Sequence, residues 1–153
     1  MEIARGNETH IEACLSIARK LAGKYFTENG IATMSEDLRK HLLYVAVDWD
    51  EVGGFVTVHR KSDRVAEISW MAVKPERQCR GIGSALIDYI ASDLRSQGFK
   101  LLYVKTLSED VKYPPYEITR LFYRKVGFIH LETIDPYPGW DPGNPCAIYV
   151  RIL

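Results

Sequence analysis

Residues 67–90 read EISWMAVKPERQCRGIGSALIDYI, and this stretch decides the fold. Its beginning belongs to the run Val65–Val73, whose apolar and β-branched residues predict a strand. Its end starts a helix, because Leu86, Ile90 and Leu94 recur at every fourth position. A short polar loop joins the two. A strand that runs through such a loop into a helix presents the unpaired backbone N–H groups of the helix to an anion.

The loop Gln78–Gly83 has the features that a phosphate group needs. Gly81 and Gly83 lack the Cβ atoms that would hold an anion away from the backbone. Both glycines would also suit a turn that only starts a helix. Three cationic side chains flank the loop and favour the polyphosphate interpretation: Lys74, Arg77 and Arg80.

Two common nucleotide loops do not fit these residues. No Lys-Ser or Lys-Thr follows the glycines, as a Walker loop requires, and Leu86 stands where a dinucleotide fingerprint has its third glycine. The longer pattern is more specific. Strand residues EI (67–68) and AV (72–73), followed by Q-x-x-G-x-G (78–83), resemble the acetyl-CoA-binding motif of the GNAT family of N-acetyltransferases.

This resemblance implies that the diphosphate of acetyl-CoA lies on the backbone amides of the loop. It also implies an N–H donor for the oxyanion of the reaction near Met71–Val73, where the strand of the family bulges and its neighbour splays away. Thr106 and Leu107 would lie across that gap. The residues implied to contact the cofactor are Met71, Ala72, Val73, Gln78, Cys79, Arg80, Gly81, Ile82, Gly83, Ser84 and Tyr116.

A second motif, LFYRKVGF at 121–128, resembles the later F-Y-x-x-x-G-F signature of the same family. Gly127 ends a helix and Phe128 begins the next strand. Tyr123 stands one turn before the helix end, where its phenol could protonate the departing thiolate. The reference pKa values, about 10 for tyrosine and about 8.5 for a thiol, permit this transfer. A packing tyrosine with a satisfied hydroxyl is the alternative.

One position departs from the family pattern. Many members carry a cofactor-contacting asparagine seven residues before the tyrosine, and here that position is Tyr116. Thr119 stands where alanine is common. The role of the asparagine is therefore not transferred, and Tyr116 either lines the site or covers the end of the helix.

Acylation of an amine requires a base, because a lysine-like amine with a pKa near 10.4 is mostly protonated at neutral pH. Glu67 aligns with the strand glutamate that serves as base in some protein-acetylating relatives. Strict alternation would place it on one face with Ser69, Met71 and Val73. A strand carboxylate that pairs with a nearby lysine or arginine is the alternative. Three other carboxylates compete for the role: Glu109, Asp110 and Glu132.

Composition limits the class of protein. The 153 residues suit one domain, 1–153, and the 20 basic and 20 acidic residues cancel, which argues against nucleic-acid binding. No apolar run is long enough for a membrane span, and we expect a cytoplasmic protein. Three unclustered cysteines and four scattered histidines indicate neither disulfides nor a metal site.

The remaining patterns predict an α/β fold with a mixed sheet of about seven strands and helices on both faces. This order of elements is also that of the GNAT family. A capping box at 9–12 would start the first helix, and Ser35 the second, after a loop at 23–33. The other predicted strands are 2–5, 43–47, 52–58, 101–106, 128–133 and 146–153, and the last helix covers 118–126.

The sequence therefore favours an acetyl-CoA-dependent N-acetyltransferase in which a primary amine attacks directly in a ternary complex, without a metal. A catalytically inactive CoA-binding regulator of the same fold and an ordinary nucleotide-binding domain are the alternatives. The acceptor, a small molecule or a peptide, cannot be read from the sequence. Pairing of the last strands could join two copies into a homodimer. Five loop aromatics form either an acceptor pocket or loop anchors: Tyr25, Phe26, Tyr113, Tyr137 and Trp140.

Overall fold

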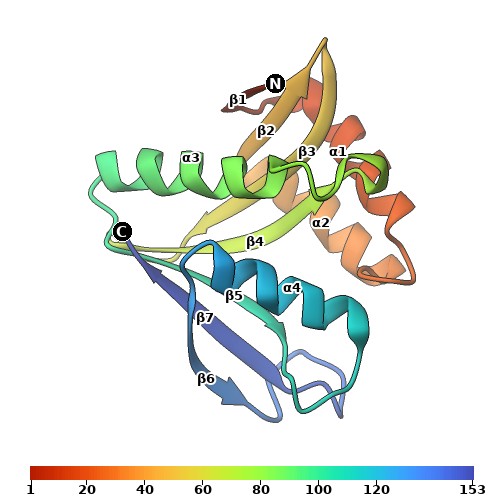
Figure 1. The fold of residues 1–153 in the computed structure, drawn as a ribbon, viewed down its shortest axis with the longest axis vertical. Coiled ribbons are helices and arrows are strands. Elements are labelled where there is room, and N and C mark those ends of the chain that lie inside the picture. Colours follow the sequence, from red (N-terminus) through yellow and green to blue (C-terminus); the bar gives the residue numbers. More distant parts are fainter.

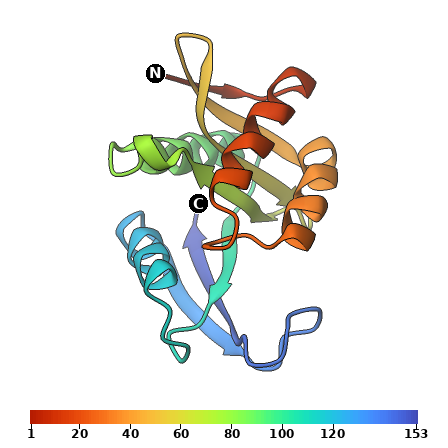
Figure 2. The same cartoon turned by 90° about the vertical axis from the view of Figure 1, so that its right-hand side faces the viewer.

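The computed structural model describes residues 1–153 and shows a seven-stranded mixed sheet between two pairs of helices (Figures 1 and 2). The strand order is β1-β2-β3-β4-β5-β7-β6, and only β4 and β5 pair in parallel. The predicted fold class is confirmed. The elements are β1 Glu2–Arg5, α1 Ile11–Lys20, α2 Glu28–Lys40, β2 Leu42–Asp48, β3 Glu51–Arg60, β4 Val65–Val73, α3 Ile82–Ser96, β5 Leu101–Leu107, α4 Pro114–Lys125, β6 Ile129–Ile134 and β7 Cys146–Ile152.

Each face of the sheet has its own hydrophobic core. Helices α3 and α4 cover one face, which we call the back, and their core includes Leu86, Ile90 and Tyr123. Helices α1 and α2 cover the other face, the front, around Phe55 and Met34. Figure 2 shows that α1 and α2 cover only the half of the front that belongs to β1–β4. The front of β5, β7 and β6 therefore has no helix over it.

The sheet is incomplete between β4 and β5. Val65–Ile68 pair with Leu101–Val104, and no pairing follows. Beyond this point β4 stays paired with β3, while β5 stays paired with β7. The two strands then diverge as a V in Figure 1, and we call the space between them the gap. One edge of β4, from Ser69 to Val73, thus has no strand partner.

A β-bulge at Ser69 changes which side chains share a face. Thr57 pairs with Trp70 but Val58 pairs with Ile68, so Ser69 is the additional residue. Ile68 and Met71 consequently pack on the same, back core, while Trp70 packs on the front core. The predicted grouping of Glu67 with Met71 and Val73 is wrong for this reason.

Two predicted helix starts are also wrong. Asn7, rather than the box at 9–12, caps the first helical turn, and its side chain accepts from the backbone N–H of Thr9 at 2.9 Å. Helix α2 begins at Glu28 instead of Ser35, because the Thr27 hydroxyl accepts from the N–H of Gly30 at 3.0 Å. None of the helices combines the length and the apolarity needed to cross a bilayer.

Candidate active site

The loop between β4 and α3 exposes free backbone N–H groups. Cys79 and Gly81 adopt positive φ angles of 60° and 83°, which turn the chain sharply into the helix. No side chain caps α3, and its first hydrogen bond runs from the Ala85 N–H to the Gly81 carbonyl at 2.9 Å. The N–H groups of residues 82–84 are thus left without a partner in the helix. This arrangement suits the diphosphate of a coenzyme.

The three cations predicted around this loop have different environments. Lys74 pairs with Glu51, and Arg77 donates to Glu51 at 2.7 Å and to Asp48 at 3.3 Å. Two of the cations therefore bind the β2–β3 turn. Arg80 is exposed and takes part in no ion pair, so its guanidinium alone is free to meet a phosphate.

The open edge of β4 also has free amide groups. The Lys74 N–H donates to Gly53 of β3 at 2.9 Å. Because backbone groups alternate along a strand, Ala72 also points to β3, while Met71 and Val73 point into the gap. The Gln78 side chain donates to the Val73 carbonyl at 3.2 Å. The N–H groups of Met71 and Val73 can therefore pair with an extended amide chain, such as the pantetheine arm of acetyl-CoA.

Three elements approach closely at Gly83. A Cβ atom there would lie 3.1 Å from the ring of Phe122 on α4 and 3.3 Å from the methyl group of Met71. The side chains of Phe122 and Met71 would have to shift by a few tenths of an ångström to admit it. Ile82 and Ser84, on either side of it, are buried and half-buried.

Tyr123 lies on the back of the sheet, packed between the rings of Phe122 and Phe128 with centroid distances of 5.2 and 5.3 Å. Four residues later, Gly127 adopts a left-handed backbone conformation (φ 92°) and follows the end of the helix, as predicted. The Tyr123 hydroxyl makes no hydrogen bond within the chain. Burial raises the pKa of this phenol, and nearby Tyr116 raises it further, so the group stays protonated at neutral pH.

Thr106 provides an independent sign that a ligand belongs in the gap. It lies on β5 beyond the last residue that pairs with β4. Its side chain is on the same face of the strand as Leu102 and Val104, which belong to the back core. Its hydroxyl is fully buried and has no hydrogen-bond partner. Buried polar groups are rarely left unpaired, so this orphaned hydroxyl and the free amides fit a polar chain such as pantetheine.

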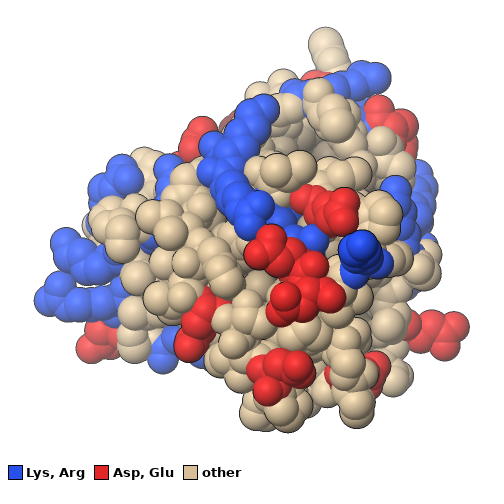
Figure 3. Space-filling view, turned by 60° about the horizontal axis from the view of Figure 1, so that its bottom comes forward, with Lys and Arg blue, Asp and Glu red and all other residues tan.

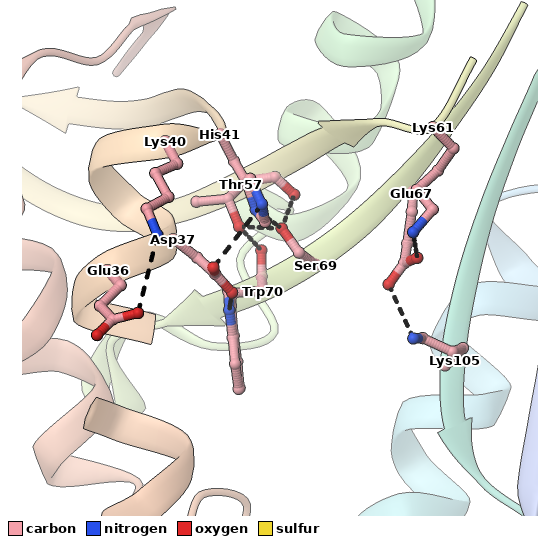
Figure 4. Close-up of polar contacts among 10 residues, drawn as sticks. All are labelled: Glu36, Asp37, Lys40, His41, Thr57, Lys61, Glu67, Ser69, Trp70 and Lys105. Carbon is pink, nitrogen blue, oxygen red and sulfur yellow. Dashed lines mark hydrogen bonds and ion pairs between the residues drawn. The ribbon is translucent and has the colours of Figure 1, made fainter. Parts of the chain in front are cut away.

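Glu67 lies on the front of the sheet, opposite the side chains of Met71 and Tyr123, and is 6% exposed. Its carboxylate accepts from the Tyr103 hydroxyl at 2.6 Å. It also pairs with Lys105 at 3.3 Å and with Lys61 at 3.8 Å (Figure 4). Burial, together with the hydrogen bond to Glu67, raises the pKa of the Tyr103 phenol. Glu67 is thus a strand carboxylate paired with nearby lysines, which was the alternative to its role as a base, and it lies next to the gap.

A polar cluster on the same face was missed by the sequence interpretation. His41 and Ser69 lie 2.8 Å apart in a hydrogen bond, and Ser69 also contacts the Thr57 hydroxyl at 2.8 Å (Figure 4). The His41 ring stacks on His59 at 4.3 Å. Burial lowers the pKa of His41, against the opposing charge of Asp37. The only sequence signal was the position of His41 between a helix and a strand.

Tyr113, which immediately precedes α4, and Tyr116, in its first turn, bind the loop between α1 and α2. Tyr113 donates its hydroxyl to the Lys24 carbonyl at 2.7 Å, and Tyr116 donates to the Tyr25 carbonyl at 3.0 Å. We call these contacts the tyrosine clasp. The loop between α1 and α2 and the start of α4 both lie on the right of Figure 1, the side on which β4 and β5 are farthest apart. Tyr116 thus connects the start of α4 to the α1–α2 loop.

The competing carboxylates lie elsewhere. Glu109 pairs with Arg124 at 3.7 Å, Asp110 accepts from Ser108 at 3.0 Å, and Glu132 is exposed on β6. No group of histidine, cysteine, aspartate and glutamate side chains is arranged to hold a metal ion.

Comparison with known proteins agrees with this geometry. The model of the acetyltransferase (GNAT) domain matches residues 39–130, more than half of the chain. The chain belongs to the GNAT family of acetyltransferases. The match includes both sides of the gap and both sequence motifs. No curated protein matched the sequence.

Solved structures show the same fold at low sequence identity. A GNAT-family acetyltransferase from Desulfovibrio desulfuricans has a TM-score of 0.85 and 20% identity over 99% of this chain and 98% of that one. An aminoglycoside 6'-N-acetyltransferase in complex with coenzyme A has a TM-score of 0.77 and 19% identity, over 99% of this chain and 97% of that one. The ribosomal-protein-S18-alanine N-acetyltransferase from Escherichia coli has a TM-score of 0.77 and 18% identity, over 99% of this chain and 92% of that one.

Proposed function

We propose that this GNAT protein transfers the acetyl group of acetyl-CoA to a primary amine, by direct attack within a ternary complex. One observation supports the proposal: the loop before α3 and Tyr123 lie on the back of the sheet, Glu67 and Ser69 lie on the front, and β4 and β5 are unpaired between them. Acetyl-CoA would supply an activated acyl group. The chain would bind it through residues 78–84, Arg80, and the N–H groups of Met71 and Val73.

Glu67 is the base in this proposal. It takes a proton from the acceptor ammonium, directly or through water, on the front of the sheet. Its hydrogen bond from Tyr103 and its two lysine partners hold the carboxylate in place. Because these partners occupy the carboxylate oxygens, the acceptor must displace one of them to come close.

Tyr123 is the proposed acid. A buried phenol with a raised pKa is a weak acid in water, but the leaving thiolate would be buried as well. Burial raises the pKa of the two core thiols of this chain, Cys14 to about 12 and Cys146 to about 11. The pKa of a CoA thiol in the gap would rise in the same direction, which keeps the difference between the pKa values of the thiol and of Tyr123 small enough for proton transfer.

The acceptor would approach the front of the sheet between α2 and the loop 135–145. Tyr137 and Trp140 of that loop pack on one another at 5.5 Å. Figure 3 shows the lower end of Figure 1 turned forward, where acidic and basic side chains stand next to each other. Two of the three solved structures named above are those of an aminoglycoside 6'-N-acetyltransferase and a ribosomal-protein-S18-alanine N-acetyltransferase. We infer a small-molecule or peptide amine here, because no uniform field of one sign selects a polycation.

A thiol-release assay with acetyl-CoA against a panel of amines and peptides tests this function and the acceptor class together. Acetyl-CoA should raise the melting temperature by several degrees, because it binds only the folded chain. Glu67→Gln should lower turnover while the coenzyme affinity remains. A protein that binds CoA but consumes no acetyl-CoA with any amine would instead be a catalytically inactive regulator. The absence of any thermal shift would contradict both readings.

A further inference from the structure

Lys105 has an unusual place in the site. It is the first residue of β5 beyond the last rung that β5 shares with β4, so it stands at the closed end of the gap. Its ammonium lies on the front, 3.3 Å from a carboxylate oxygen of Glu67 and 3.4 Å from the Tyr137 hydroxyl. The Tyr137 ring lies under it at 5.1 Å. A primary amine of the chain therefore contacts the proposed base.

This is the place that an external acceptor amine must occupy. An acceptor needs contact with Glu67 for deprotonation, and it needs access to the gap, where the acyl group would lie. Figure 4 shows the Lys105 side chain reaching across the end of the gap from β5 to Glu67 on β4. Lys61 also pairs with Glu67, at 3.8 Å, but it follows β3, away from the gap, and its side chain is 41% exposed.

We propose that Lys105 is a site of self-acetylation, modified on its Nζ when acetyl-CoA is bound and no external acceptor is present. This inference rests on the proposed function. Glu67 takes one proton from the ammonium, and the freed electron pair of Nζ attacks the thioester carbonyl carbon. A C–N bond forms, the C–S bond breaks, and the thiolate takes the proton of Tyr123. The second amine proton is lost to solvent, which restores Tyr123 through water, and the products are an amide and free CoA.

The surroundings of Lys105 make this reaction slower than turnover of a good acceptor. Burial would lower the pKa of the Lys105 ammonium, but the charge of Glu67 and the Tyr137 hydroxyl outweigh it and raise that pKa. The neutral amine is therefore a minor form at neutral pH, and the modification should become faster as the pH rises. An external amine that displaces Lys105 from Glu67 should protect it.

The modification would change the front of the site. An acetylated Lys105 carries no charge, so Glu67 would retain only Lys61 as a cationic partner. The added acetyl group would also occupy the space between Glu67 and the gap. Modified protein should therefore bind an acceptor more weakly. Acetylation of Lys105 would thus inhibit the enzyme when acetyl-CoA is present without an acceptor.

The experiment follows the mass of the full-length chain during incubation with acetyl-CoA alone, with peptide mapping of the product. We expect one acetyl group on Lys105, none on that residue in Lys105→Arg, and slower modification in Tyr123→Phe. Lys61→Arg, the matched control, should still be acetylated at Lys105. Excess free CoA should suppress modification of Lys105 but not the slow background on exposed lysines. Circular dichroism establishes that each variant is folded.

Two results would overturn the proposal. One is acetylation spread over exposed lysines at the rate found for the urea-unfolded chain. The other is an unmodified Lys105 in a protein that acetylates external amines, which leaves the proposed function intact. If acetyl-CoA neither shifts the melting temperature nor reacts with any amine, the proposed function fails together with this inference.

Discussion

The two halves of β4 show how one strand serves both stability and chemistry. Ala66–Ile68 are paired with β3 on one side and β5 on the other, whereas the residues after Ser69 are paired with β3 alone. In the first half both edges of the strand are therefore paired. In the second half the N–H groups of Met71 and Val73 remain available. The same sheet thus holds a closed half that stabilises the fold and an open half that can bind a ligand.

Side chains follow the same division. Ile68, in the closed half, is 3% exposed and contributes to the back core. Met71, in the open half, is half-buried and lies against Gly83 at the start of α3. The bulge at Ser69 separates the two. Substitutions on either side should therefore affect different measurements, and the following predictions use that difference.

The largest effect should come from Tyr123→Phe, which leaves the packing but removes the hydroxyl beside the open half. We expect kcat to fall by about 10²–10⁴-fold with the folded structure intact, because general acid catalysis contributes about that much. Steady-state kinetics measure it. Tyr149→Phe, in the same core, removes a hydroxyl that bonds to Arg124 at 3.1 Å and should leave kcat nearly unchanged. Equal losses in both variants would contradict the assignment.

Ile68→Ala should destabilise the closed half by about 2–5 kcal/mol, because it removes buried methyl groups and leaves a cavity. Urea denaturation followed by fluorescence measures the free energy of unfolding. Met71→Ala is the matched substitution in the open half and should cost clearly less, since Met71 is only partly buried. A larger loss for Met71 than for Ile68 would reverse the proposed division.

Gly81→Ala should weaken coenzyme A binding by roughly 5–30-fold. The left-handed conformation of Gly81 costs an L-residue about 1–2 kcal/mol, and relaxation of that strain would turn the free N–H groups of α3 away. Gly98→Ala is a close control, because Gly98 is also left-handed (φ 91°) and has open space, at the other end of α3. Calorimetric titration with CoA should show a change only for Gly81, and a similar loss for Gly98 would indicate a general loss of stability.

The smallest effect concerns His41 near the bulge. Burial lowers the pKa of His41, so the folded chain favours the neutral imidazole. Its contribution to stability is then present above the unfolded pKa of about 6.5 and is lost as the pH falls below it. Unfolding free energies measured from pH 8 to pH 5 should decline less steeply in His41→Gln than in the unaltered protein. If the unfolding free energies of the two proteins declined equally with falling pH, a group other than His41 would be responsible for the decline.

Much of the fold could be predicted because its signals are local. The run Val65–Val73, Gly81 before α3, and Gly127 each act within a few residues, and the predicted strand, the start of the helix after the loop and the end of the last helix are confirmed. Helix α2 was placed too late because Asn29 and Gly30 resemble a loop. Thr27 was the available cap signal, although only the folded chain shows that its hydroxyl is used.

The candidate site was predictable only in part. Sequence motifs identify Glu67 and the loop, but the partners of Glu67 come from distant segments, with Tyr103 36 positions away. The bulge is a matter of register between β3 and β4, and alternation along one strand cannot reveal it. The prediction that Met71 and Val73 share a face with Glu67 was wrong for this reason alone.

The tyrosine clasp has a topological consequence. The β4–β5 ladder fastens the two halves of the sheet at one end, and the bonds from Tyr113 and Tyr116 to Lys24 and Tyr25 fasten them at the other. The unpaired stretch of β4 and β5 is therefore held at both of its ends. A ligand that inserts an amide chain there would meet two strands whose separation is set before it arrives, so little of its binding free energy would be spent on ordering the protein.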